Sequence, residues 1–487
     1  MSTSFARLRV SLVEALSTLG ICTLVGLFAA DALAALAVLV LLVGLKLVAT
    51  NDRLYVMQAA YAFQWMQTTL GVFYFDFAGR EVPAIYSSDY RVMVYIALGC
   101  CFALALGIRA GMMLLEAPDP EEGRPGFAFS FGLLIVAYVI ATSFEGTLNA
   151  MAADYPSLRQ IIVTADTARL GILFLVLRRL LNPVPRWTLV TLLVTFEVVL
   201  GITGFFAGFR EPIVLAALAT LEIFDRRNLR HWTVLAIASV CTMALGLLWM
   251  GIRTDYRRDY VDLDNFEVSR STRMHNIETL TSNWLRTDSD SLWYTADKLV
   301  DRMWTIYYPA LAIARVPSHL PHTNGEILSG ALVHIVTPRV FFPGKPDLQS
   351  DSEKVRKYSG VMVAGAEKNT SIAFGYAAES YIDFGLPWMF LPIVGFGVAI
   401  GVCYALFRRL ILHRDLWVAF ATVAFWLSLY LFERSWATML GVSLGMMVYL
   451  GMPIVLLDRL LLARHLSRKH AEAAGMYDIR PQPSEAS

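Results

Sequence analysis

Residues 232–251, WTVLAIASVCTMALGLLWMG, form an unbroken apolar stretch without a charged side chain. An α-helix of about 20 residues rises about 30 Å, which matches the thickness of the hydrocarbon layer of a membrane. Similar stretches recur along the chain, which is 56% hydrophobic and only 17% charged. Soluble domains are nearer half apolar and a quarter charged. The sequence therefore predicts an all-α polytopic integral membrane protein.

Apolar stretches of suitable length predict about twelve membrane-spanning helices. The first stretch follows a short basic start with Arg7 and Arg9, and we expect it to remain in the protein as a span. The predicted spans are 10–29, 32–49, 54–74, 92–114, 127–147, 160–181, 187–207, 210–224, 232–251, 387–407, 416–432 and 437–457.

Arginines in the short loops predict the orientation, because positive charge collects on the cytoplasmic side of a membrane. Alternating spans place four basic clusters on one face, so both termini are expected in the cytoplasm of a bacterium, with the spans in its inner membrane. The clusters are Arg178, Arg179 and Arg186; Arg226, Arg227 and Arg230; Arg408, Arg409 and Arg414; and Arg459, Arg464, Arg468 and Lys469. The segments expected outside are 75–91, 144–159, 207–211, 252–386 and 433–436.

The spans divide the chain into four parts. Residues 1–251 form an N-terminal transmembrane bundle, and 252–386 form one large periplasmic loop with amphipathic helices between spans 9 and 10. Residues 387–457 form the C-terminal spans, and 458–487 form a partly disordered cytoplasmic tail. A loop of this length is unusual as a mere connection, so it is expected to carry function.

Within this loop, residues 288–308 (DSDSLWYTADKLVDRMWTIYY) have the pattern of an amphipathic helix. Its apolar side chains could lie on the bilayer surface, with Asp297, Lys298 and Asp301 turned to water. A helix packed on the core of the loop explains the pattern equally well. The apolar side chains concerned are Leu292, Trp293, Leu299, Val300, Met303, Trp304 and Tyr307.

The first candidate site is the turn Gly208–Pro212, at the predicted outer end of one span and the start of the next. Proline suits the first turn of a helix, and a helix N-terminus attracts anions through its free N–H groups and its dipole. Arg210 adds a planar set of donors suited to phosphate. A tight turn with a surface pair between Arg210 and Glu211 is the alternative.

The second candidate is Thr337–Pro346 (TPRVFFPGKP), in which three prolines favour a stiff, extended segment. Arg339 and Lys345 are displayed from it. A rigid loop with two cations suits a diphosphate, because little order must be gained on binding. A solvated turn explains the segment equally well.

The third candidate, residues 368–385 (KNTSIAFGYAAESYIDFG), leads into the span at 387. Thr370 or Ser371 could cap a helix over 372–384. Tyr376, Glu379 and Asp383 would then share one face of this helix. Glu379 could bind a sugar hydroxyl or take a proton from one. Pairing of Glu379 with an arginine that holds the loop down is the alternative. The substrate-binding candidates of this segment are Lys368, Tyr376, Tyr381 and Asp383.

Charged residues inside predicted spans also require an explanation. Asp166 and Arg169 lie one turn apart and are expected to pair, although Arg169 could instead face a substrate headgroup. Glu197 lies near the middle of its span without an evident partner. The five cysteines fall in apolar stretches, and the loop histidines show no zinc spacing, so neither a metal nor a cofactor is expected.

Several of these motifs together resemble the Wzy-type oligosaccharide repeat-unit polymerases of O-antigen and exopolysaccharide biosynthesis. The order is Pro-Arg-x-x-x-Pro-x-Lys-Pro, then Thr-Ser-x-x-Phe-Gly-x-x-x-Glu-x-Tyr-x-x-Phe-Gly, then a span, with a Gly-x-Arg turn two spans before the large loop. One departure is Asp383, where the family pattern suggests a small polar Asn. The matching positions are Arg210, Pro338, Arg339, Pro343, Lys345, Pro346, Thr370, Ser371, Phe374, Gly375, Glu379, Tyr381, Phe384 and Gly385.

The resemblance implies a metal-independent membrane glycosyltransferase of GT-C-like architecture. Its substrate would be an oligosaccharide repeat unit on a polyprenyl diphosphate, and its partners would be membrane lipid, a chain-length regulator and a flippase, with no nucleic acid. A hydroxyl of the incoming unit would attack the anomeric carbon of the growing chain. Arg210 and Arg339, with Lys345, would stabilise the leaving diphosphate, and Glu379 would assist the hydroxyl.

Three other functions fit part of the pattern, and one of them is a glycosyltransferase that adds single sugar residues from a lipid-linked donor. A proton-coupled transporter or exporter would explain twelve spans with a carboxylate at mid-membrane, although no internal repeat supports it. A glycan ligase that uses the same lipid-linked donor would have a similar site. Products formed by the purified protein from a lipid-linked repeat unit would separate these functions from a polymerase.

Overall fold

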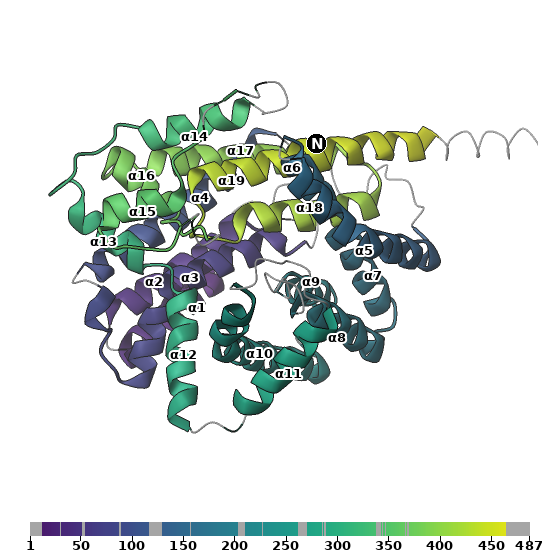
Figure 1. The fold of residues 1–487 in the computed structure, drawn as a ribbon, viewed down its shortest axis with the longest axis horizontal. Helices are drawn as coiled ribbons and strands as arrows, with labels where there is room; N and C mark the ends of the chain where they lie inside the picture. Colours follow the sequence, from purple (N-terminus) through teal and green to yellow (C-terminus); the bar gives the residue numbers. More distant parts are fainter. Residues whose placement is uncertain are drawn as a thin grey trace, which may run out of the picture.

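The computed structural model describes residues 12–463, except 30, 51–53, 87–88, 116–128, 156, 203–209, 226, 262–269, 285, 287–288, 338–341, 343, 346, 366 and 368–369. Within these residues the secondary structure is helical and contains no strand (Figure 1). The helices are α1 (Leu12–Ala29), α2 (Ala32–Leu47), α3 (Val56–Ala78), α4 (Tyr90–Leu114), α5 (Phe131–Asp154), α6 (Arg159–Asp166), α7 (Ala168–Leu181), α8 (Trp187–Ile202), α9 (Arg210–Glu222), α10 (Leu229–Val261), α11 (Arg270–Trp284), α12 (Ser289–Met303), α13 (Tyr307–Arg315), α14 (Glu326–Val336), α15 (Asp351–Ser359), α16 (Tyr376–Phe384), α17 (Phe390–Leu410), α18 (Arg414–Leu429) and α19 (Trp436–Gly445). A short 3-10 helix covers Ala84–Tyr86, and a π-helix over Met446–Gly451 continues α19.

Six helices of the described chain are long and apolar enough to cross a membrane. Their exposed surface is apolar: on α10, for example, Ile237, Val240 and Met243 are each more than half exposed. Such a surface is stable in lipid and costly in water. The chain is therefore a helical, membrane-associated protein. The six are Tyr90–Leu114, Phe131–Asp154, Arg159–Leu181, Leu229–Tyr256, Phe390–Leu410 and Trp436–Ala463.

The other six predicted spans also coincide with helices, namely α1, α2, α3, α8, α9 and α18. These helices are shorter or more polar than the six above. Buried side chains such as Gln64 and Gln67 make α3 polar, and α18 packs inside the protein with Trp417, Phe420 and Phe425 fully buried. Twelve spans thus remain a prediction, although the helices themselves lie where the sequence places them.

Helices α4 and α17 pack with their backbones in direct contact. A Cβ atom on Gly111 would lie 2.1 Å from the carbonyl oxygen of Val398, and one on Gly401 would lie 2.2 Å from that of Ile108. Gly107 and Gly397 form an equally close contact one turn away. Small residues four positions apart on both helices permit this approach, as in other membrane helix pairs.

Part of the predicted loop folds around its own small core. Ala312 of α13 and Val316, which follows α13, pack against Val355 of α15 and against Ala378 and Ile382 of α16. Helices α13 to α16 gather at one end of the molecule (Figure 1). The continuous helix Trp436–Ala463, which begins with α19, runs from this region to the opposite side, where the described chain ends (Figure 1). Helix α10 continues to Val261, past the predicted start of the loop at residue 252.

The amphipathic segment 288–308 is not one helix on a membrane surface along its whole length. Helix α12 ends at Met303, and Trp304 is fully buried against α3, where its Nε1 donates to the carbonyl of Thr68 at 3.0 Å. Leu292 and Trp293, at the other end, are exposed. The C-terminal half therefore packs on the protein core.

Candidate functional site

Two arginines from distant parts of the sequence, Arg210 and Arg434, meet at Tyr430, and a third, Arg302, pairs with Glu433 next to Arg434. Arg210 begins α9, Arg302 lies in the last turn of α12, and Arg434 lies in the loop that joins α18 to α19. We call these three residues, together with Glu211 and Glu433, the arginine cluster.

Direct contacts hold the arginine cluster together. Arg210 donates to the hydroxyl of Tyr430 at 2.6 Å and to Glu211 at 2.8 Å, and its guanidinium carbon lies 4.5 Å from the centre of the Tyr430 ring. The guanidinium of Arg434 lies 4.8 Å from the same ring. Arg302 makes a bidentate pair with Glu433, at 2.9 and 3.0 Å.

The cluster carries a net charge of +1, because three guanidinium groups face two carboxylates. The pKa of Arg302 is raised by the charge of Glu433, whereas burial and the charge of Arg210 act in the opposite direction. The side chains of Arg210 and Arg302 are 42% and 51% exposed, whereas those of Glu211 and Glu433 are 18% and 26% exposed. Arg210 and Arg302 are thus more accessible than the two carboxylates, whereas Arg434 donates to the carbonyl of Leu427. The two exposed guanidinium groups suit an anion that can accept several charge-assisted hydrogen bonds.

Buried glutamines of α3 position the loop that carries Arg434. Gln67 donates to the carbonyl of Tyr430 at 3.2 Å and accepts from the backbone N–H of Phe432 at 2.8 Å. Gln64 donates to the carbonyl of Leu429 and accepts from the hydroxyl of Tyr376 at 2.8 Å. These bonds satisfy backbone groups that the end of α18 leaves without helical partners.

Glu379 supports the other end of the same loop. It is fully buried, pairs with Lys354, and accepts from the backbone N–H of Trp436 at 2.7 Å, at the start of α19. Lys354 also pairs with Asp351 at 2.8 Å. Burial raises the pKa of Glu379, although Lys354 opposes the shift. The partner is a lysine rather than the expected arginine, and Glu379 has no exposed surface for a sugar hydroxyl.

The neighbours of Glu379 are also engaged within the protein. Asp383 is fully buried and accepts from the hydroxyl of Thr323 and from the backbone N–H groups of Ile327 and Leu328, at 3.1 and 2.8 Å. It therefore stabilises the N-terminus of α14. Tyr376 is fully buried, and the hydroxyl of half-buried Tyr381 donates to the carbonyl of Val316 at 3.2 Å.

Helix α16 begins later than the sequence suggests. It starts at Tyr376 after Gly375, and no side chain caps it, so Thr370 and Ser371 are not its caps. Gly375 has a φ of +94°, and an added Cβ would lie 2.5 Å from the carbonyl oxygen of Phe432. Both features require glycine at this position.

The remaining predicted site residues do not join the arginine cluster within the described chain. Lys345 donates to the carbonyls of His334 and Thr337, at 2.6 and 2.9 Å, and so closes the C-terminal end of α14. Arg339 and Lys368 lie outside the described residues.

Arg169 pairs with Glu197, at 2.8 and 2.9 Å, and more distantly with Glu145, at 3.7 Å, rather than with Asp166 as expected. Tyr138 also donates to Glu197. These contacts give Glu197 the partner that the sequence did not reveal, and they favour an interior ion pair over a headgroup contact for Arg169.

Sequence reasoning did not single out Arg302, Glu433 or Arg434. The available signal was a pair of adjacent charges, Glu433-Arg434, in a short connection between apolar stretches that was expected to lie outside. Among the described residues, no group of three or more histidine, cysteine or acidic side chains could hold a metal ion.

Comparison with known proteins gives one match. The model of a family described as a domain of unknown function (DUF8712) matches residues 128–406, which is more than half of the chain. No curated protein and no solved structure matches the chain. The matched region runs from α5 to α17 and includes Arg210, Arg302 and Glu379.

Proposed function

The chain belongs to the DUF8712 family, and we propose that it polymerises oligosaccharide repeat units carried on a polyprenyl diphosphate, at the outer face of the bacterial cytoplasmic membrane. The product would be a surface or extracellular polysaccharide. The enzyme would be a metal-independent membrane glycosyltransferase with twelve spans and a GT-C-like architecture.

The observation that carries this proposal is the arginine cluster. When the anomeric carbon is attacked, its bond to the diphosphate breaks and negative charge develops on the leaving oxygen. Planar guanidinium groups bind diphosphate oxygens in pairs, and fixed cations stabilise developing charge without reorganisation. Arg210 and Arg302 expose much of their side chains, and Tyr430 holds Arg210 in place.

The position of the arginine cluster fits a lipid-linked substrate. Arg210 begins one helix, and the loop with Arg434 joins two others, so the cluster lies at helix ends rather than along a helix. Both 207–211 and 433–436 are segments that the basic clusters predict to lie outside. A substrate with its tail in lipid and its diphosphate at the outer rim would reach this position.

The attacking hydroxyl must lose its proton as the new glycosidic bond forms. The diphosphate departs with the bonding electrons of the broken bond, and a carboxylate receives the proton. Glu433 belongs to the arginine cluster and keeps 26% of its side chain exposed, whereas Glu379 is fully buried. We therefore assign this role to Glu433 rather than to Glu379.

The proton-coupled carrier has less structural support than the polymerase, whereas the ligase differs from the polymerase only in its products. A proton-coupled carrier would need a carboxylate free to titrate, but Glu197 is held by Arg169 and Tyr138. A ligase would use the same donor and the same cluster, and it differs in its products. With purified protein in lipid nanodiscs and a lipid-linked repeat unit, a polymerase forms a ladder, a ligase needs another acceptor, and a carrier leaves the glycan unchanged.

Arginine variants test the proposed site in this assay. We expect Arg210→Ala, Arg302→Ala and Arg434→Ala each to slow chain growth by about 100-fold or more, the usual effect of removing one preorganised donor from a site of developing charge. Arg339→Ala should have a similar effect if the loop predicted from sequence also contacts the diphosphate. Arg286→Ala, at an exposed arginine of the predicted outer loop, is the matched control.

Ladders of wild-type length from the Arg210→Ala and Arg302→Ala variants would refute the diphosphate site. We also expect chain growth to continue in EDTA, because the guanidinium groups supply the positive charge at the leaving oxygen. A strict requirement for a divalent cation would contradict this expectation.

A further inference from the structure

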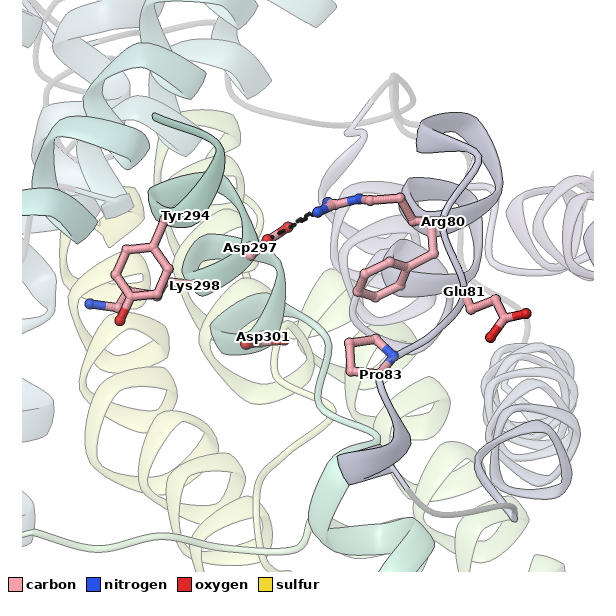
Figure 2. Close-up of a pocket in the computed structure, with 8 residues that line it drawn as sticks. Arg80, Glu81, Pro83, Tyr294, Asp297, Lys298 and Asp301 are labelled. Carbon is pink, nitrogen blue, oxygen red and sulfur yellow. Dashed lines mark hydrogen bonds and ion pairs between the residues drawn. The ribbon is translucent and has the colours of Figure 1, made fainter. Parts of the chain in front are cut away.

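A second polar site lies beside the arginine cluster, in a pocket of about 260 Å³ between the C-terminal end of α3 and one face of α12 (Figure 2). We call it the α3–α12 pocket. It is smaller than the ~300–1,000 Å³ of sites that hold drug-sized ligands, so it has room for about one ring. Its lining includes Phe75, Arg80 and Glu81 from the α3 side and Tyr294, Asp297 and Asp301 from α12.

Hydrogen bonds fix two of the three carboxylates of this pocket before any ligand arrives. Arg80 reaches across from the α3 side to Asp297, at 2.6 and 3.2 Å (Figure 2). Tyr74 donates to the same carboxylate at 2.7 Å. The hydroxyl of Tyr86 donates to Asp301. A carboxylate accepts about four hydrogen bonds, so both retain capacity for the hydroxyl groups of a ligand.

The charges of the α3–α12 pocket disfavour an anion. Arg80 and Lys298 face three carboxylates, so the net charge is −1. The ammonium of Lys298 lies 4.3 Å from the centre of the Tyr294 ring, and both side chains lie at one margin of the pocket (Figure 2). The Tyr294 ring is exposed, and the face that Lys298 does not cover is apolar. Fixed acceptors beside an exposed aromatic ring suit a neutral, hydroxyl-rich ring.

Helix α12 connects this pocket to the arginine cluster. Asp301 of the pocket and Arg302 of the cluster are adjacent in sequence, and Tyr294 precedes Arg302 by eight residues, a rise of about 12 Å along the helix. A short oligosaccharide could therefore bridge the two sites.

From these observations we infer that the α3–α12 pocket binds one sugar ring of the oligosaccharide whose diphosphate lies at the arginine cluster. The inference rests on the proposed function for the identity of the ligand as a glycan. It assigns Tyr294 the role of a stacking surface and Asp301 the role of a hydroxyl acceptor.

Binding of free sugars tests this inference separately from catalysis. The full chain in nanodiscs is mixed with the methyl glycosides of glucose, galactose, mannose and N-acetylglucosamine, and saturation-transfer NMR reports which of them bind. We expect at least one to bind to the wild type and to bind at least tenfold more weakly to Tyr294→Ala. Trp293→Ala removes an equally exposed aromatic ring that does not line the pocket, and it should bind as the wild type does.

Absence of binding to the wild type, or equal binding to the Tyr294→Ala variant, would overturn the inference. The Arg302→Ala variant distinguishes the two proposals, because it should keep sugar binding while it loses chain growth. Ladder formation without sugar binding contradicts only the pocket. Sugar binding that depends on Tyr294, together with no ladder from the wild type, contradicts only the polymerase.

Discussion

Glu379 and Lys354 form an ion pair inside the protein, where Glu379 has no exposed surface and the Lys354 side chain is 9% exposed. Glu379 also binds the first backbone N–H of α19, two residues after Arg434. The carboxylate thereby positions the loop of the arginine cluster and has no surface left for a ligand.

A pair of variants separates positioning from catalysis at Glu379. Glu379→Gln should destabilise the protein by about 3–5 kcal/mol, because it leaves the ammonium of Lys354 with only Asp351 in a buried site. Adding Lys354→Met removes the unpaired charge, and the glutamine can still accept from Trp436. The double variant should regain thermal stability and chain growth. Recovery of stability without recovery of chain growth would identify Glu379 as a catalytic group instead.

Of the five residues of the arginine cluster, only Arg210 and Glu211 could be predicted from the sequence. Arg210 follows from sequence because Pro212 marks the first turn of a helix and a guanidinium at that point suits phosphate. Its partner Tyr430 lies 220 residues away, and Arg302 looks like one more charge on an amphipathic helix. No local pattern reports that α9, α12 and the loop after α18 meet.

At the scale of elements, the length of an apolar stretch was the dependable signal, since every predicted span coincides with a helix. The periodicity of apolar residues was less informative about whether lipid or protein covers the apolar face of a helix. The pattern of 288–308 fitted both a lipid-covered and a protein-covered helix. Trp304 packs on α3 because Gly71 leaves room for its ring. A Cβ atom on Gly71 would lie only 2.0 Å from a ring atom of Trp304.

The contact between α4 and α17 supports a prediction about packing. We expect Gly401→Ala to destabilise the protein by about 1–3 kcal/mol, the usual cost of overpacking, because the new methyl group would meet the backbone of α4. Gly395→Ala is the matched control on the same helix, since no atom lies within 4 Å of a Cβ there. It should be neutral or slightly stabilising. Thermal unfolding of both variants in detergent measures the difference, and equal midpoints would contradict the close packing.

At the scale of the whole molecule, the arginine cluster and the α3–α12 pocket depend on one arrangement of the chain across the membrane. Six helices are long and apolar enough to span it, and the basic clusters predict which ends face the cytoplasm. Segments 433–436 and 75–91 each supply part of one site, and both are predicted to lie outside. A lipid-linked sugar presented at the outer face could then reach both sites.

Cysteine accessibility tests this arrangement in intact cells. In a background without the five native cysteines, Ser318→Cys at the exposed end of α13 should react with a membrane-impermeant maleimide added outside. Asp225→Cys, in the exposed connection between α9 and α10, should react only after the membrane is permeabilised, because it adjoins the predicted cytoplasmic arginines Arg227 and Arg230. The reverse pattern would place the arginine cluster in the cytoplasm. A diphosphate leaving group displaced there could not belong to a polymerase of the outer face, so this one experiment bears on the orientation and the function together.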